Sequence, residues 1–89
     1  MYEIYYTLDK GGSHLTELLS NNIYMLRAER RWSQKHLADL VGVSRQTIVS
    51  LEANRYNPSL VLAFKIAEVF EVGIEEVFQY LPQQQKGDE

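Results

Sequence analysis

Residues 33–52 impose the strongest constraint on the fold, because they contain two short helical patterns with a very short connection between them. Ser33 and Ser44 each precede one of these patterns and are good N-cap residues. Gly42 stands between the patterns, where a tight turn needs a residue that tolerates positive φ. Ala38 supplies the small side chain that a steep crossing of two helices requires. We therefore expect two crossed helices, the second held out from the body by the first.

Helical periodicity extends on both sides of this pair. Asn21 or Asn22 is expected to cap a helix before it, and Ser59 is expected to cap a longer helix after it. A short fifth helix follows, with Glu75 and Glu76 in its first turn, where carboxylates stabilise the positive end of the helix dipole. The apolar residues of the fourth helix are expected to form one buried stripe: Leu60, Ala63, Ile66, Ala67 and Phe70.

The N-terminal 20 residues form an extension with a different pattern. Residues 2–8 alternate at period two, with apolar side chains on one side, and predict a short strand. Because an isolated strand is unstable, we expect it to pair with residues near 78–81, within or between subunits. An edge strand that binds a partner protein and an unstructured segment are the alternatives. Residues 14–20 are expected to form a short helical turn.

The size of the chain limits its organisation to one domain, because 89 residues cannot build a second core. We assign residues 1–20 to the extension, 21–81 to a helical domain and 82–89 to a polar, disordered tail. The chain has no cysteine, so disulfides and thiolate metal sites are excluded. No apolar run approaches the ~20 residues that cross a bilayer, and no secretory signal is visible. A cytoplasmic protein with no membrane association is expected.

The charge is distributed unevenly along the chain. Residues 27–55 carry a net charge of +3, whereas residues 1–26 carry −2 and residues 56–89 carry −4. A local basic face still attracts phosphate on an acidic protein, because screening confines the field to ~8 Å at physiological salt. An ordinary mixed surface is the other interpretation of charge alone.

Side chains recur at many fixed offsets across residues 21–80. They are Ser33-Gln34, Leu37-Ala38, Val41-Gly42-Val43-Ser44, Gln46-Thr47-Ile48, Leu51-Glu52, Asn57-Pro58-Ser59-Leu60, Lys65-Ile66-Ala67 and Val77-Phe78. With these residues the chain resembles the Cro/repressor-type helix-turn-helix family, also called the xenobiotic response element family. The resemblance implies a mainly α, five-helix lambda-repressor-like domain, to which the N-terminal strand adds a small β element. It also implies a homodimeric repressor that reads a palindromic operator in double-stranded DNA.

The resemblance also implies which residues contact DNA. The outward positions that face base edges are Ser44, Arg45, Gln46, Val49 and Ser50. The chemistry agrees, because arginine can donate two hydrogen bonds to guanine, glutamine can pair with adenine, and valine can touch a thymine methyl. Each residue also has a plainer interpretation: Arg45 and Gln46 as solvated surface, and Val49 as a side chain packed on a neighbour.

Contacts to the DNA backbone are implied for a second set of residues: Gln34, Thr47, Asn54, Arg55 and Tyr56. By the same resemblance, Arg27 and Glu52 form a partly buried ion pair that ties the first helix to the third. Removing one partner of such a pair would strand the other charge.

Two other classes of function compete with this interpretation. An antitoxin that binds its own operator uses the same motif, and the tyrosine-rich strand at residues 2–8 would then bind a toxin. An enzyme is not expected, because no catalytic constellation can be assembled. No cofactor or metal is expected either, because His14 and His36 lack a partner at helical ligand spacing. Trp32 is expected to cover the corner between the first two helices rather than to stack on a base.

Overall fold

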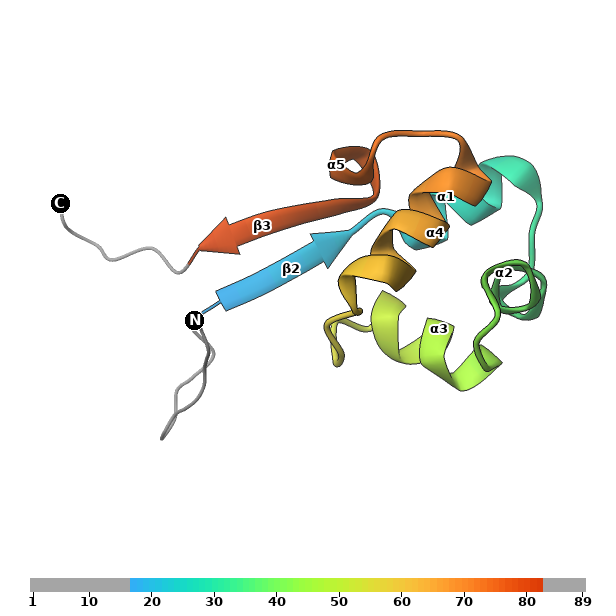
Figure 1. The fold of residues 1–89 in the computed structure, drawn as a ribbon, viewed down its shortest axis with the longest axis horizontal. Helices are drawn as coiled ribbons and strands as arrows, with labels where there is room; N and C mark the ends of the chain where they lie inside the picture. Colours follow the sequence, from blue (N-terminus) through green and yellow to red (C-terminus); the bar gives the residue numbers. More distant parts are fainter. Residues whose placement is uncertain (1–16, 83–89) are drawn as a thin grey trace, which may run out of the picture.

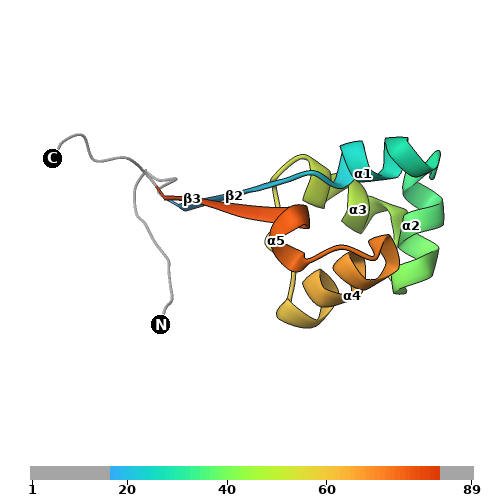
Figure 2. The same ribbon diagram turned by 90° about the horizontal axis from the view of Figure 1, so that it is seen from above.

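The computed structural model describes residues 17–82 of the chain. Five helices form the body of the molecule, and a ribbon of two strands extends from one side of it (Figures 1 and 2). The mainly α, five-helix architecture predicted from the sequence is confirmed. The elements in chain order are β2 (Glu17–Asn21), α1 (Ile23–Arg30), α2 (Gln34–Val41), α3 (Arg45–Glu52), α4 (Leu60–Phe70), α5 (Ile74–Val77) and β3 (Phe78–Pro82).

Three serines begin helices as their positions predict. The side-chain oxygens of Ser33, Ser44 and Ser59 each accept a hydrogen bond, at 2.9–3.1 Å, from the backbone N–H three residues further on. Each bond satisfies one of the free donors of a helical first turn. Gly42 ends α2 in the left-handed conformation, with φ of 78°. At the end of α4 the left-handed residue is Glu71, with φ of 61°, and Gly73 instead holds the N-cap position of α5.

The core lies between α1, α2, α3, α4 and α5. Its members are apolar side chains that are at most 7% exposed: Ile23, Leu26, Leu37, Ala38, Val41, Ile48, Leu51, Leu62, Ala63, Ile66, Ala67, Phe70 and Val77. Trp32 stacks on Phe70 with ring centroids 5.4 Å apart, so it covers the edge of this core as expected. Leu60 does not belong to the buried stripe of α4, because it is 69% exposed; Leu62 turns inward in the first turn of the helix instead.

The sheet of the described residues contains a strand that the sequence analysis did not predict. Residues 78–82 do pair with an N-terminal segment, but the partner within residues 17–82 is β2, antiparallel, with Leu19 opposite Tyr80 and Asn21 opposite Phe78. The helical turn predicted over residues 14–20 is therefore wrong for residues 17–20. A leucine-rich segment this short has no decisive period, so pairing with β3 determines its conformation. The strand predicted over residues 2–8 lies outside the described residues.

The ribbon also affects the expected boundaries. Phe78 begins β3 directly after α5, and Pro82 is the last residue of β3. The domain start at residue 21 falls on the last residue of β2, and the tail expected over residues 82–89 overlaps β3 at Pro82. Residues 83–89 are not among those described.

None of the helices found between residues 17 and 82 has the length and apolar character needed to cross a membrane.

Candidate nucleic-acid interface

The turn between α2 and α3 positions the third helix. The backbone N–H groups of Gly42 and Val43 both donate to the carbonyl of Ala38, at 2.9 and 3.0 Å. This arrangement closes the end of α2 and reverses the chain within three residues, so that α3 begins directly after Ser44. Ala38 is 1% exposed at this corner, as a steep crossing requires. The third helix is thereby held rigidly against the second.

The two sides of α3 differ in chemistry. Ile48 and Leu51 are buried and anchor the helix to the core. The opposite side is accessible to solvent, and α3 lies at the lower edge of the molecule in Figure 1, away from the ribbon. All five residues for which base contacts were expected are exposed or partly exposed: Ser44, Arg45, Gln46, Val49 and Ser50. We call these five residues the α3 surface.

A chain of side-chain hydrogen bonds braces the α3 surface from behind. Arg45 Nη2 donates to Gln34 Oε1 at 3.1 Å, and Gln34 Nε2 donates to Glu52 Oε1 at 3.1 Å. Gln34 opens α2, whereas Arg45 and Glu52 are the first and last residues of α3. The amide of Gln34 therefore links the side chains of the first and last residues of α3 and restrains the guanidinium of Arg45 beside the exposed face.

The chain of bonds ends in an ion pair between helices. Arg27 Nε lies 2.7 Å from Glu52 Oε2, and Arg27 Nη2 donates to Glu52 Oε1 at 3.0 Å. Both side chains are only 11% exposed. Arg27 Nη1 donates further to the carbonyl of Trp32 at 2.9 Å. The structure thus brings together the two residues that the sequence analysis paired, and α1 fixes the C-terminal end of α3.

The segment after α3 presents three further residues from the expected set. Asn54, Arg55 and Tyr56 are exposed, and Asn54 adopts a left-handed conformation with φ of 60°. The N–H of Asn54 donates to Leu51 O and the N–H of Arg55 to Ser50 O, both at 3.0 Å. This is the hydrogen-bond pattern of a Schellman C-terminal motif, with asparagine where glycine is usual. The motif holds the three residues close to the C-terminal end of α3.

Thr47, the remaining residue expected to contact the DNA backbone, lies at the N-terminal end of α3. It is partly exposed, and its hydroxyl shares a hydrogen bond of 3.0 Å with the hydroxyl of Ser44. All five backbone-contact candidates therefore border the α3 surface: Gln34 and Thr47 near its start, and Asn54, Arg55 and Tyr56 at its end.

Two arginines near the α3 surface remain available to bind an anion. Arg27 is neutralised by Glu52, and Lys35 lies 3.1 Å from Asp39. Neither Arg45 nor Arg55 forms an ion pair with any residue between 17 and 82. Because an unpaired guanidinium keeps its full attraction for phosphate and for guanine, this side of the molecule is suited to a polyanion.

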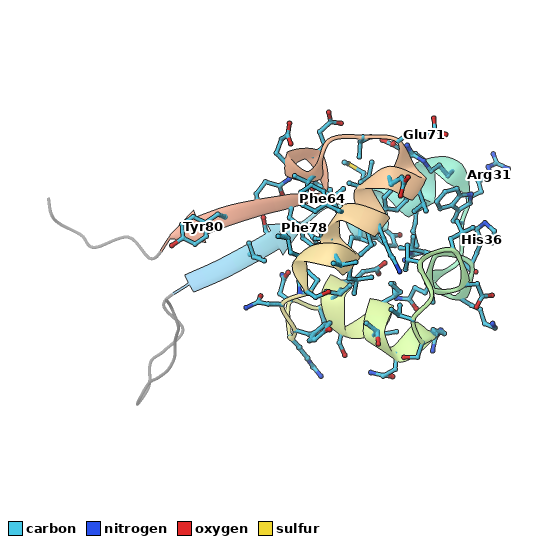
Figure 3. All side chains as sticks on the ribbon, viewed as in Figure 1. Arg31, His36, Phe64, Glu71, Phe78 and Tyr80 are labelled. Carbon is cyan, nitrogen blue, oxygen red and sulfur yellow. The ribbon has the colours of Figure 1, made fainter. Side chains whose placement is uncertain are left out.

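His36 takes no part in a metal site within the described part of the chain, which contains no group of three or more potential ligands. The imidazole instead packs edge-on against Trp32, with ring centroids 5.2 Å apart. Figure 3 shows His36 and Arg31 at the end of the molecule that lies opposite Tyr80.

Sequence reasoning missed two contacts that shape this interface. The bond from Arg45 to Gln34 joins residues 11 positions apart, and no period or motif indicates it. Asn21 was expected only as a helix cap, yet its side chain also reaches α3, with Nδ2 at 2.9 Å from Leu51 O. Only the assembled fold brings these groups together.

Comparison with known proteins gives a consistent result. A helix-turn-helix family model matches residues 23–77. An uncharacterised HTH-type transcriptional regulator of Methanocaldococcus jannaschii is 48% identical over 62 residues, which cover 70% of this chain and 94% of that protein. An uncharacterised HTH-type regulator of Archaeoglobus fulgidus is 50% identical over 60 residues, covering 67% of this chain and 84% of the relative.

Solved structures agree with the sequence relatives. The transcriptional regulator VanUg superimposes with a TM-score of 0.64 and 25% identity, covering 84% of this chain and 100% of that one. The restriction-modification controller protein of Aeromonas hydrophila has a TM-score of 0.59 and 31% identity, covering 62% of this chain and 83% of its own. The antitoxin HipB of Escherichia coli K12 is a more distant relative, 32% identical over 56 residues.

Proposed function

We propose that this chain, which belongs to the helix-turn-helix family of DNA-binding transcriptional regulators, reads a palindromic operator as a homodimer and represses transcription. One observation carries the proposal: α3 is anchored by Ile48 and Leu51 on one side and presents hydrogen-bonding side chains to solvent on the other. A helix held in this way at the edge of a domain fits the major groove of B-DNA.

The α3 surface supplies the groups that would read the bases. Arg45 is placed to donate two hydrogen bonds to guanine O6 and N7, and Gln46 to bond adenine N6 and N7. Val49 is placed to contact a thymine methyl, with Ser44 and Ser50 beside it. The bond that Arg45 Nη2 donates to Gln34 Oε1, 3.1 Å long, supports this role because it reduces the conformational freedom that the guanidinium loses on binding.

The bordering residues would fix the position of α3 on the duplex. Arg55 is the strongest candidate for a phosphate contact, because its charge has no ion-pair partner in residues 17–82. Thr47 and Gln34 lie at the other end of the helix, where hydroxyl and amide donors can reach the same strand. Asn54 and Tyr56 complete the set on either side of Arg55. Such contacts provide affinity that weakens with salt but carry no sequence information.

An exposed apolar face supports the homodimer. Leu60, Val61 and Phe64 share the outer side of α4 and are 69%, 65% and 53% exposed, and Tyr80 on β3 is 59% exposed. Together they leave apolar area on the order of 400 Å² open to water, close to the largest patch of a typical monomer. A standard interface buries about 800 Å² on each partner, so this patch is large enough to form the centre of one.

The position of the patch suits a two-fold arrangement. Leu60 and Val61 begin α4 directly after residues 53–59, the segment that follows α3. Figure 3 places Phe64 and Tyr80 away from the end that carries His36 and Arg31. A second copy packed on this side would set two α3 helices at the same edge of the dimer. Two helices ~34 Å apart would enter successive major grooves and read the two halves of a palindrome.

Repression would follow from occupancy of the operator, since a bound dimer prevents other proteins from binding the same DNA. No enzymatic step and no cofactor belong to this proposal. Such a regulator acts where the DNA is, which is the cytoplasm in the bacteria and archaea that are the sources of the relatives. The antitoxin alternative gains no support, because the relatives named as regulators are more similar to this chain than HipB is.

Fluorescence anisotropy on two duplexes tests the proposal. One duplex carries the DNA upstream of the protein's own gene and the other carries the same bases in scrambled order. We expect the upstream duplex to bind about 10³-fold more tightly, with both affinities falling as salt rises. Equal, weak binding to both duplexes would contradict specific recognition of this site.

A further inference from the structure

The side chain of Asn21 joins three elements at the end of the α3 surface. Its Oδ1 accepts from the backbone N–H of Ile23 at 3.0 Å, which satisfies one of the free donors at the start of α1, where Asn22 holds the N-cap position. Its Nδ2 donates to the carbonyl of Leu51 at 2.9 Å and to Oδ1 of Asn54 at 3.0 Å. Asn21 is also the last residue of β2, where it is paired with Phe78. One amide therefore connects the ribbon, α1 and the segment that follows α3.

The bond to Asn54 determines which way the Asn54 amide faces. An asparagine side chain has one acceptor oxygen and one donor nitrogen, on opposite sides of its amide. Because Asn21 donates to Oδ1 of Asn54, the donor Nδ2 of Asn54 is turned away from Asn21. That nitrogen has no hydrogen-bond partner among residues 17–82, and Asn54 is exposed. Its free N–H groups suit an acceptor such as a phosphate oxygen.

We propose that Asn21 is a positioning residue for DNA binding: it orients the Asn54 amide so that Nδ2 donates to a phosphate of the DNA backbone. The inference rests on the proposed function for its ligand, and on the three bonds of Asn21 for its geometry. The backbone at Asn54 is fixed as well, because the N–H groups of Asn54 and Arg55 hold its left-handed conformation, with φ of 60°, through bonds to the carbonyls of Leu51 and Ser50. Asn21, the last residue of β2, would thereby orient a contact made at the C-terminal end of α3.

Asn21→Asp separates this role from the bond to the first N–H of α1. A carboxylate still accepts from the N–H of Ile23, but it can donate neither to Asn54 Oδ1 nor to the carbonyl of Leu51. The Asn54 amide then turns its Nδ2 toward the carboxylate, and the outward donor is lost. Asn22→Asp is the matched control, because it adds the same charge one residue away and the Asn22 side chain, among residues 17–82, bonds only the carbonyl of Glu76, at 3.0 Å.

Two measurements decide the proposal. In NMR exchange spectra of the free protein, we expect the Asn54 side-chain amide protons to exchange rapidly with water in the wild type and to become protected in Asn21→Asp. In anisotropy titrations on a duplex selected with the wild type, we expect Asn21→Asp to bind about tenfold more weakly. We expect Asn22→Asp to bind within about twofold of the wild type.

A second substitution, made together with Asn21→Asp, tests whether the new carboxylate weakens binding merely by repelling the DNA. Asn54→Gly keeps the left-handed backbone and removes the amide, so Asn21→Asp should have no further effect on affinity in that background. A persistent effect there, or an Asn54 amide already protected in the wild type, would overturn the inference. A wild type that selects no duplex would instead contradict the proposed function, whereas the exchange measurement would still decide the orientation of the amide.

Discussion

The guanidinium of Arg27 and the carboxylate of Glu52 meet through two nearly parallel contacts, 2.7 Å between Nε and Oε2 and 3.0 Å between Nη2 and Oε1. The pair joins the first helix to the end of the third, and the carboxylate also accepts from Gln34 Nε2. Charge-assisted bonds of this kind have defined geometry as well as strength. The position of α3 relative to the body therefore depends on a few polar contacts in addition to the packing of Ile48 and Leu51.

Removing one partner of this pair should destabilise the fold strongly. Glu52→Ala is expected to lower the free energy of unfolding by about 3 kcal/mol, because it leaves the Arg27 charge buried without a partner. Lys35→Ala is the control, since the Lys35–Asp39 pair is 70% and 62% exposed and contributes less than about 0.5 kcal/mol. Urea unfolding measures both values. Equal effects of the two substitutions would show that the partial burial of the first pair has no energetic importance.

Gly42→Ala should destabilise through the backbone alone. The site has φ of 78°, but a β-carbon there would have no atom within 4 Å. The cost is therefore the left-handed conformation itself, about 1 kcal/mol, which corresponds to a fall of roughly 4–8 °C in Tm. Gly42→Asn is expected to cost less, because asparagine tolerates this conformation. A thermal scan in which the alanine variant melts with the wild type would refute this account of the turn.

Arg55→Ala should weaken DNA binding on every sequence rather than change sequence preference. Loss of one phosphate contact is expected to reduce the slope of log affinity against log salt by about 1. The control is Arg31→Ala, which removes the same charge from the turn between α1 and α2. Titrations at four salt concentrations give the slopes. An unchanged slope for Arg55→Ala would mean that Arg55 does not contact phosphate.

Phe64→Glu should separate the two copies of the proposed homodimer and leave the fold intact. Phe64 is 53% exposed on the outer side of α4, so a charge there costs the monomer little but opposes burial against a second copy. Leu40→Glu places the same charge at a 45% exposed apolar position on α2 and should leave the dimer unchanged. Sedimentation velocity distinguishes the species. A wild type that sediments as a monomer, or a Phe64→Glu variant that remains a dimer, would exclude this face as the interface.

The helices could be predicted from the sequence because their signals are local. Ser33, Ser44 and Ser59 each cap a helix within their own turn, and Gly42 ends α2 by its backbone freedom. The ribbon could not be predicted in the same way. The pairing of Leu19 with Tyr80 joins segments 61 positions apart, and a segment as short as residues 17–21 has no decisive period.

The DNA contacts of the site residues stay predictions, and of the bonds among these residues only the Arg27–Glu52 pair could be expected from the sequence. Outward positions on α3 follow from helical periodicity once Ile48 and Leu51 are turned inward. The contacts from Arg45 to Gln34 and from Asn21 to Asn54 depend on how the elements pack. The sequence around an asparagine or glutamine does not indicate whether its side-chain amide bonds another side chain or only water. The hydrogen-bond partners of these amides are therefore known only from the fold.

The most direct test of the central claim, that α3 reads the major groove, is dimethyl sulfate protection on a duplex selected with the wild type. The reagent methylates guanine N7 in the major groove, where Arg45 is expected to bind. We predict protected guanines in two segments about one helical turn apart, and loss of that protection with Arg45→Ala at matched occupancy of the DNA. Full reactivity of every guanine N7 under saturating wild-type protein would contradict the account.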